Sequence, residues 1–396
     1  MSILRDKHNV YVKNTELRFV RSLMTDLPWE ERLVGIKGSR GVGKTTLLLQ
    51  YIAKNYGLSA DALYISLDDI LFTEIKLVDV VDDFVKKGGK HLFLDEVHKY
   101  PNWSIGLKNI YDYHKELRVV FTGSSLLEML NSSADLSRRA LVYELQGLSF
   151  REYLELYYQI KFDRLSLQDV LSNPDISADI SNEIKPLAYF IDYLKHGYYP
   201  FYSGNEILYY KKLNSVINMI LEIELPQLRG VEVSKINKVK QLLYVVSQSV
   251  PFKPNVSSLA SKIGVTRNTL VEYLRHLDDV NLINSLNKSS FGVSVLQKPE
   301  KIFLENTNLS YALGDGLADV GNVRETFFLN QLKYQNKVTY PAKGDFLING
   351  KYLFEVGGKR KTNTQIKNEK DSFLAVDNLE IATESKIPLW LFGFLY

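Results

Sequence analysis

Apolar runs alternate with helical segments through the first part of the chain. Five runs are each long enough for one buried strand: 33–36, 61–69, 91–94, 117–125 and 140–145. Continuous apolar runs of this length are typical of strands buried on both faces of a sheet. Because helical segments separate them, the pattern predicts an α/β fold with a parallel, doubly wound sheet whose ligand lies at its carboxyl edge.

Helical periodicity dominates the middle of the chain. Residues 150–228 are rich in tyrosine, and a break at Gly197–Pro200 ends one predicted helix. The polar stretch 165–183 predicts a loop or short helices inserted into this region. The tyrosines lie at helical spacing, which favours a core role, although stacking on nucleic-acid bases stays open.

A helix-turn-helix is predicted further on. A helix over 257–263 meets a turn at Gly264, and Thr266 is placed to cap a second helix that ends at Asp279. One apolar face is shared by Leu259, Ile263, Leu270, Leu274 and Leu277. With a β-hairpin expected over 281–297, the order is that of a winged helix.

The last hundred residues read as a second α/β domain. A helix over 321–335 precedes the strands "DFLI", "YLFEV", "LEIAT" and "LWLFGFL", with a helical stretch at 363–376. Four domains are therefore expected: a P-loop core (1–149), a helical subdomain (150–230), a winged helix (231–297) and a nuclease-like domain (298–396).

Composition narrows the class of protein only moderately. The 396 residues are 45% hydrophobic and 24% charged, as in folded proteins. The net charge of +3 is compatible with nucleic-acid binding but is too small to indicate it. No apolar run approaches the ~20 residues of a membrane span. The chain has no cysteine and its start lacks the pattern of a signal peptide, so we expect a cytoplasmic protein.

The clearest chemical motif follows the first strand. Gly38, Ser39, Arg40, Gly41, Val42, Gly43, Lys44 and Thr45 match G-x-x-x-x-G-K-[ST], and Thr46 continues into a predicted helix. Glycines allow backbone N–H groups to surround a phosphate at a helix N-terminus, where the helix dipole also favours anions. Lys44 is placed to reach the β- and γ-phosphates of ATP, and the Thr45 hydroxyl to ligate Mg²⁺.

Two further strand ends supply candidate catalytic groups. Asp95 and Glu96 end the strand at 91–94, where the aspartate is suited to hold Mg²⁺ and the glutamate to polarise water. The strand at 117–125 carries Thr122 and Ser124, either of which is a candidate sensor of the γ-phosphate if this strand lies between the other two.

These motifs together resemble a prokaryotic ATPase family of the AAA superfamily. "GSRGVGKTTLL", "LFLDEVHKYPNW", "VVFTGSS" and "RRALVYELQGLSFREYLEL" follow in the family's order, and its members carry a C-terminal domain of unknown function of the 4143 type. The resemblance implies that Arg139 contacts the γ-phosphate, in cis or from a neighbouring subunit. Arg138 stands where the family usually has glycine.

The winged helix leaves two interpretations open. Arg267, Asn268 and Thr269 begin the second helix, and such residues are able to contact phosphates or base edges of DNA. Winged helices in this ATPase superfamily also serve as packing lids, and the later part of the helix has no basic stripe.

The C-terminal order of elements resembles the restriction-endonuclease-like fold, whose active members hold Mg²⁺ with acidic residues. By position these are Glu325, Asp345 and Glu355, but Gly357 stands where the fold usually has a lysine. Only Lys359 or Lys361 is near enough to replace it, which requires the chain to fold back. An active nuclease, a degenerate nucleic-acid module and a structural or partner-binding domain all stay open.

The sequence therefore predicts a Mg²⁺-dependent ATPase that acts as a conformational switch, with Lys44, Glu96 and Arg139 in the catalytic roles. The alternatives are an ATP-regulated DNA-binding protein, a nuclease with a degenerate C-terminal site, and a scaffold for a protein partner. Oligomers are compatible with each.

Overall fold

The computed structural model describes residues 2–123, 136, 138–229, 231–248, 253, 255–288, 298–383 and 385–396. The chain forms two compact units, Met1–Gly147 and Leu148–Tyr396. The finer division of the second unit stays a prediction, and its expected border at 297/298 falls between two strands that pair in one sheet.

The first unit is built on a five-stranded parallel sheet in the order β2-β3-β4-β1-β5. The strands are β1 (Leu33–Lys37), β2 (Ala62–Ser66), β3 (His91–Asp95), β4 (Arg118–Gly123) and β5 (Leu141–Glu144). The predicted parallel sheet is confirmed, including the strand inserted between β1 and β3, which is β4.

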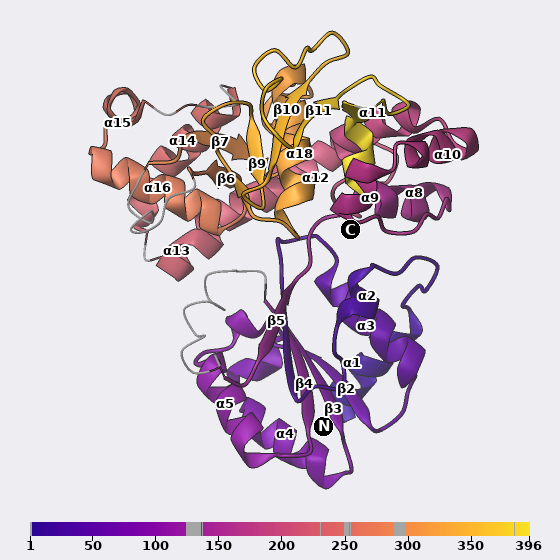
Figure 1. Cartoon of the computed structure of the whole chain (residues 1–396). Coiled ribbons are helices and arrows are strands. Elements are labelled where there is room, and N and C mark those ends of the chain that lie inside the picture. The colour runs from indigo at the N-terminus through magenta and orange to yellow at the C-terminus, as the bar shows by residue number, and fades with distance from the viewer. Residues whose placement is uncertain are drawn as a thin grey trace. The chain divides into compact units, whose positions relative to one another are not determined.

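Helices cover both faces of this sheet, which confirms the doubly wound arrangement. Figure 1 shows α1 and α3 on one side and α4 and α5 on the other. The helical elements are α1 (Ser2–Lys13), α2 (Leu23–Asp26), α3 (Lys44–Asn55), η1 (Ile70–Thr73), α4 (Leu77–Lys86), η2 (Val97–Lys99) and α5 (Trp103–Tyr113). In α4, Leu77, Val81 and Phe84 recur at helical spacing and are fully buried.

The second unit begins with helices packed around aromatic side chains. They are α8 (Phe150–Tyr158), α9 (Leu167–Ser172), α10 (Asp175–Glu183), α11 (Pro186–His196), α12 (Glu206–Met219), the π-helix η3 (Ile220–Glu224), α13 (Leu225–Arg229), η4 (Val233–Lys235) and α14 (Ile236–Gln248). The predicted short helices at 165–183 and the helix end at Gly197 are confirmed. Tyr153, Tyr193 and Tyr209 are buried, so they are core residues and not a stacking surface.

The helix-turn-helix prediction is also confirmed in detail. Helices α15 (Val256–Ile263) and α16 (Arg267–Asp279) are joined at Gly264, which has a φ of +74°, and the Thr266 hydroxyl accepts a hydrogen bond from the Thr269 N–H. Strand β6 (Ile283–Leu286) pairs antiparallel with β7 (Lys301–Leu304). The second arm expected for the hairpin, at 289–297, lies outside the described residues.

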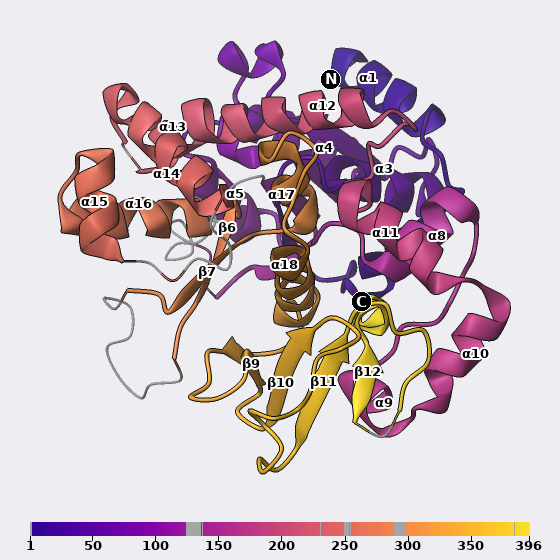
Figure 2. The same cartoon turned by 90° about the horizontal axis from the view of Figure 1, so that it is seen from above.

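A mixed sheet in the order β12-β11-β10-β9-β8 follows two further helices. Figure 2 shows α18 against this sheet. The elements are α17 (Thr307–Leu313), α18 (Val320–Lys333), β8 (Val338–Thr339), β9 (Phe346–Ile348), β10 (Tyr352–Gly357), β11 (Ser372–Val376), β12 (Lys386–Pro388) and the 3-10 helix η6 (Leu389–Phe394).

Three sequence predictions fail in this sheet. The helix expected at 363–376 is a series of turns that ends in β11, because Ile366 is the only large apolar side chain between 359 and 371 and cannot make an apolar face. "LEIAT" is not a strand, and Ser372–Val376 takes its place. "LWLFGFL" is a buried 3-10 helix instead of a strand.

In the described part of the chain, no helix combines the length and the apolar character needed to cross a membrane.

Candidate functional site

The loop between β1 and α3 lies close against the chain that follows β5. A Cβ added to Gly38 would stand 2.3 Å from the carbonyl oxygen of Leu145, so any larger residue would displace this backbone. Gly43 has a φ of +102° directly before α3 begins at Lys44. Glycine adopts this conformation without strain, which lets the loop turn into the helix with its N–H groups at the helix start.

Lys44 folds over its own loop. Its ammonium group donates hydrogen bonds to the carbonyl oxygens of Gly38, at 2.8 Å, and Ser39, at 3.1 Å. The side chain is buried, whereas Arg40 is half-buried and Gly41 and Thr46 are exposed. The one buried ammonium of the loop thus lies where an anion at the helix start would meet it.

Asp95, at the end of β3, is held by three hydroxyl groups. The Thr45 hydroxyl donates to Oδ2 at 2.6 Å, the Tyr64 hydroxyl donates to the same oxygen at 2.9 Å, and Thr122 donates to Oδ1. The structure therefore brings the predicted pair Thr45 and Asp95 into direct contact. Tyr64, on β2, was not predicted; burial, and then the charge of Asp95, raises its pKa, so the phenol stays protonated.

Glu96 adopts a left-handed backbone conformation, with a φ of +53°. Its N–H donates to the Thr122 hydroxyl at 3.1 Å, which holds the turn in place. Backbone strain in a non-glycine residue is characteristic of functional sites. The second predicted sensor, Ser124, lies outside the described residues.

His98 is a second residue that the sequence did not reveal. Its Nε2 lies 3.5 Å from Oε2 of Glu96. Burial lowers the pKa of His98 to about 3, with smaller contributions from the positive charges of Lys99, Lys44 and Arg40, so the imidazole is neutral. A neutral ring contacts Glu96 without cancelling the charge of its carboxylate.

Arg21 fixes the P-loop to the end of the first unit. Its buried guanidinium donates to the carbonyl oxygens of Val42, at 2.8 Å, Gln146, at 2.7 Å, and Gly147, at 2.8 Å. Guanidinium carries several donors in a rigid plane, which suits it to several carbonyls at once. No motif predicted this residue.

Arg139 does not lie beside the P-loop of its own chain. It precedes β5, whose residue Leu141 pairs with Val34 near the start of β1, so Arg139 lies at the amino edge of the sheet. The P-loop follows the opposite, carboxyl end of β1. There Arg139 forms a bidentate ion pair with Asp112, at 3.0 and 3.1 Å. The expected contact in cis is therefore corrected, because the sheet separates the two groups.

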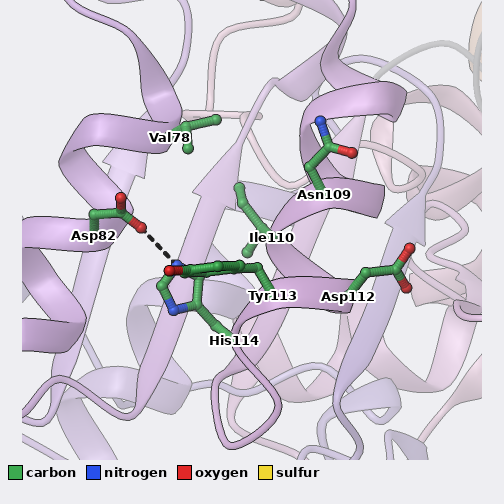
Figure 3. A pocket seen from close by; sticks show the side chains of 7 residues that line it. All are labelled: Val78, Asp82, Asn109, Ile110, Asp112, Tyr113 and His114. Atoms are coloured by element: carbon green, nitrogen blue, oxygen red, sulfur yellow. Dashed lines mark hydrogen bonds and ion pairs between the residues drawn. The ribbon is translucent and has the colours of Figure 1, made fainter.

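A shallow pocket of about 490 Å³ lies near this arginine. It is lined by residues of α4 and α5 and by the residue that follows α5: Val78, Asp82, Asn109, Ile110, Asp112, Tyr113 and His114 (Figure 3). His114 contacts Asp82 at 2.7 Å, and none of the lining residues belongs to the P-loop. This pocket is thus separate from the predicted nucleotide site.

The start of α16 presents the residues predicted to contact DNA. Arg267 and Asn268 are exposed, whereas Thr269 is half-buried and its hydroxyl lies 2.8 Å from that of Thr266. A second pocket, of about 510 Å³, is lined by Lys253, Asn255, Val256, Ser257, Arg267, Lys298 and Glu300. Its cations outnumber its one carboxylate, which suits an anion.

The C-terminal carboxylates gather around two ammonium groups. Lys301 donates to Oε2 of Glu325, at 3.1 Å, and to Oδ1 of Asp345, at 3.2 Å. Lys361 lies 2.8 Å from Oε1 of the buried Glu355. Among the described residues, no three acidic or histidine side chains are arranged to hold a metal ion, so the predicted metal site at these positions is corrected.

Gly357 explains how Lys361 reaches Glu355. A Cβ at Gly357 would stand 2.7 to 2.8 Å from side-chain carbons of Lys361, so the lysine crosses the space that a side chain would fill. The Lys361 N–H donates to the Gly358 carbonyl at 2.8 Å and closes the turn. Lys359, the other candidate, is exposed.

Residues 30–154 match the family model described as "AAA domain". The first unit contains an AAA domain of P-loop type. Residues 187–319 match "Domain of unknown function (DUF8612)", a different domain from the 4143 type that the resemblance implied. The chain is 27% identical to "Uncharacterized protein MJ1637" of Methanocaldococcus jannaschii, over 97% of this chain and 85% of that protein.

Solved structures resemble the chain only distantly. AMPPCP-bound DnaA from Aquifex aeolicus is 16% identical with a TM-score of 0.26, over 65% of this chain and 84% of that one. Saccharomyces cerevisiae RIF2 is 15% identical with a TM-score of 0.30, over 55% of this chain and 94% of that one. TM-scores this low support no inference about the function of the chain.

Proposed function

We propose that the AAA domain binds and hydrolyses ATP with Mg²⁺ and uses the turnover as a conformational switch. The observation that carries the proposal is the contact of Thr45 with Asp95, at 2.6 Å, beside the buried ammonium of Lys44. A hydroxyl and a carboxylate in contact are the oxygen donors that P-loop proteins use for Mg²⁺.

The donor set fits Mg²⁺ without a change of residue type. Thr45 and Asp95 would hold the ion, and bound Mg²⁺ would neutralise charge on the β- and γ-phosphates. Lys44 exchanges the carbonyls of Gly38 and Ser39 for phosphate oxygens, and the N–H groups at the start of α3 bind the same anion.

Glu96 is the proposed residue that polarises the attacking water. The bond from its N–H to Thr122 holds the carboxylate at the strand end, next to Asp95. His98 is the proposed positioning residue for this carboxylate, since its neutral ring lies 3.5 Å from Oε2 of Glu96. Thr122 also contacts Asp95, so it links the two acidic groups.

The test of this assignment is phosphate release by Glu96→Gln. We expect turnover to fall by about 100-fold or more while a fluorescent ATP analogue still binds, since general-base groups contribute about 10²- to 10⁴-fold. Glu74→Gln makes the same change at an exposed glutamate and is the matched control. Equal turnover in Glu96→Gln and the wild type would remove Glu96 from the mechanism.

Arg139 is proposed to act on the nucleotide of a neighbouring subunit. Its place at the amino edge of the sheet supports a role in trans and not in cis. Mixing Arg139→Ala with Glu96→Gln tests this, because each variant lacks a different half of a shared site. Partial recovery of turnover on mixing is the expected result, and two variants that stay inactive together would contradict it.

Arg21 supports the switch. It joins Val42 of the P-loop to Gln146 and Gly147, the last residues before the second unit begins at Leu148. A loop movement on nucleotide binding would thus change the carbonyl contacts of the connecting chain. A protein partner of the second unit would receive this signal, and an affinity for that partner that differs between ATP and ADP would test it.

A second candidate function is DNA binding through α16. The pocket with Lys253, Arg267 and Lys298 favours it, because these cations lie together at the starts of α15 and α16. Anisotropy of a labelled duplex should show binding that weakens as salt rises.

In that assay Arg267→Ala with Lys298→Ala should weaken binding and lower the salt slope by about one per lost phosphate contact. Lys86→Ala with Lys115→Ala removes the same charge from exposed positions of the AAA domain. No binding at low salt, with or without ATP, would end the DNA proposal.

A further inference from the structure

The two outer strands of the AAA-domain sheet differ in what covers their free edges. These strands are β2 and β5, the ends of the order β2-β3-β4-β1-β5. At β2, Arg5 of α1 donates to the Ala62 carbonyl at 2.6 Å. Nδ1 of His8, also in α1, accepts a hydrogen bond from the Tyr64 N–H at 3.0 Å. Side chains of α1 therefore satisfy backbone groups along β2 where a further strand would otherwise pair.

No strand among the described residues pairs with the outer side of β5. In a parallel pair, every second residue of a strand bonds to its neighbour and the residues between them point away. The Leu145 N–H donates to the Lys37 carbonyl at 2.8 Å, so the bonds to β1 come from Leu145 and every second residue before it. The backbone groups of Val142 and Glu144 therefore point to the open side of the sheet, where a further strand would bind.

Apolar side chains of β5 are exposed as well. Leu141 and Val142 are each 46% exposed, whereas Ala62–Ile65 of β2 are all buried. Because consecutive strand residues point to opposite faces, the sheet is open on both faces at this edge. An exposed apolar edge strand is a template for pairing with another chain, and proteins usually cover or charge such edges. β5 therefore offers both the backbone groups and the apolar surface of a pairing strand.

The charges along this strand favour a second copy of the same chain as the partner. Arg138, which is exposed, and Arg139 precede β5, and Glu144 ends it. If two copies of this strand lie side by side in opposite directions, the arginines of each copy face the glutamate of the other. Opposite charges across paired strands are stabilising, whereas a parallel arrangement would oppose like charges. Glu144 lies 3.8 Å from Lys37 and its side chain is still 28% exposed, so it remains accessible to a second cation.

The carboxyl end of β5 is next to the P-loop. Leu145 follows β5, and its carbonyl oxygen would stand 2.3 Å from a Cβ added to Gly38. In an antiparallel pair, Arg139 of the second copy lies beside this end of β5, because it precedes the amino end of its own strand. Neighbouring strands are about 4.8 Å apart, so the backbone of that arginine is roughly 10 Å from the end of β1 that leads into the P-loop.

We infer that β5 is the contact strand of a homodimer, in which the antiparallel edges of two copies join their sheets and bring Arg139 of each copy to the P-loop of the other. The inference rests on the proposed role of Arg139 in trans and names the surface that would serve it. Arg139 must then leave its ion pair with Asp112. The two side chains are 29% and 46% exposed, and ion pairs at such exposure contribute little to stability.

Cross-linking tests the pairing directly, because the chain has no cysteine of its own. Leu141→Cys, Val142→Cys and Tyr143→Cys each place one thiol in the middle of the contact strand. Residues opposite each other in antiparallel strands have Cα atoms about 4.5 or 5.5 Å apart, within the range that a disulfide needs. We expect a disulfide-linked dimer of the full chain at the position that faces itself across the two-fold axis. Ile70→Cys, at a more exposed apolar residue of the same unit, should stay monomeric.

Sedimentation velocity of the full chain with a non-hydrolysable ATP analogue gives a second measurement. Val142→Pro removes an N–H that points away from β1, and Val142→Lys places a charge on the edge. Each change occurs twice in a two-fold pair, so the dissociation constant of the dimer should rise by about tenfold or more. Ile70→Lys is the matched control and should leave it within about twofold. Circular dichroism checks folding, and Val142→Lys serves where the proline variant does not fold.

Three results would overturn the inference. They are a wild-type chain that stays monomeric with the analogue bound, a dimer that Val142→Lys leaves equally tight, and cross-linking that is no greater at the three β5 positions than in Ile70→Cys.

Mixing Arg139→Ala with Glu96→Gln separates the failure of this inference from that of the proposed function. Recovery of turnover that is lost when both variants also carry Val142→Lys supports the paired strands. Recovery that survives this change would place the contact in trans on another surface and overturn the inference. A disulfide dimer at β5 without any recovery on mixing would instead refute the role of Arg139 in trans and support the paired strands alone.

Discussion

The chain holds two groups of carboxylates that differ in the kind of donor that bonds to them. Asp95 of the AAA domain is held by neutral hydroxyls from Thr45, Tyr64 and Thr122. Glu325 and Asp345 of the second unit are held by the ammonium of Lys301. A hydroxyl can donate to a carboxylate or ligate a metal beside it, whereas an ammonium group has only donors. The first site therefore remains available to a metal, and the second is closed.

The largest difference is expected in ATP turnover. Asp95→Asn removes the charge that organises Mg²⁺ and should lower the rate of phosphate release by about 100-fold or more. Asp345→Asn is the matched change at the other site and should leave turnover within about twofold. Both rates are measured by phosphate release at saturating ATP. A comparable loss in both variants would break the comparison.

The next largest effect concerns stability at the closed site. Lys301→Ala leaves Glu325 and Asp345 facing each other without the ammonium group that bonds to both, which should lower the free energy of unfolding by about 3 kcal/mol. Urea unfolding at pH 7 measures it. A variant as stable as the wild type would mean that the lysine neutralises nothing.

Acid should affect the first unit through its buried histidines. Nδ1 of His8 accepts a hydrogen bond from the Tyr64 N–H at 3.0 Å, and burial, with the charge of Arg5, lowers its pKa to about 4. Below pH 6.5 the His8 imidazole binds a proton in the unfolded chain but stays neutral in the folded chain. The free energy of unfolding therefore decreases as the pH is lowered. Between pH 6.5 and 5 the loss is about 2 kcal/mol.

His8→Asn keeps an acceptor for Tyr64 and cannot titrate, so it should reduce this acid sensitivity. Thermal unfolding at pH 7 and pH 5 measures the difference between variant and wild type. An unchanged pH dependence in His8→Asn would place the acid sensitivity elsewhere, with the buried His91 and the buried side chain of His98 as the next groups to replace.

The smallest effect is expected at the hydroxyls of the open site. Tyr64→Phe removes one donor from Asp95 and leaves two, so it should cost about 1 kcal/mol of stability. Its effect on Mg²⁺-dependent ATP binding should stay modest, because Tyr64 is a donor to Asp95 and Thr45 remains. Titration of the nucleotide with and without Mg²⁺ checks this, and loss of ATP binding would assign Tyr64 a direct role.

Sequence patterns predicted the features that are local in the chain. The parallel sheet followed from continuous apolar strands, and the turn between α15 and α16 followed from Gly264 and the cap at Thr266. The P-loop could be predicted because its functional groups lie within eight consecutive residues, and the acidic strand end because it consists of two adjacent residues.

The residues that the sequence did not reveal have distant partners. Arg21 bonds to a carbonyl 125 positions away, and Lys301 to a carboxylate 44 positions away. No spacing rule connects such pairs, since their approach depends on how sheets and helices pack. The approach of Lys361 across Gly357 likewise could not be predicted without knowing the turn between them. The turns that precede β11 could not be predicted without knowing that Ile366 packs in the core.

The comparison between the two sites is tested most directly by the stoichiometry of bound Mn²⁺ in the wild-type chain. With a non-hydrolysable ATP analogue we expect one Mn²⁺ for each chain, held by Thr45 and Asp95 with the nucleotide, and none without it. Asp95→Asn should lose this ion, and Glu355→Gln should keep it. A Mn²⁺ that binds without nucleotide and is lost in Glu355→Gln would contradict the account.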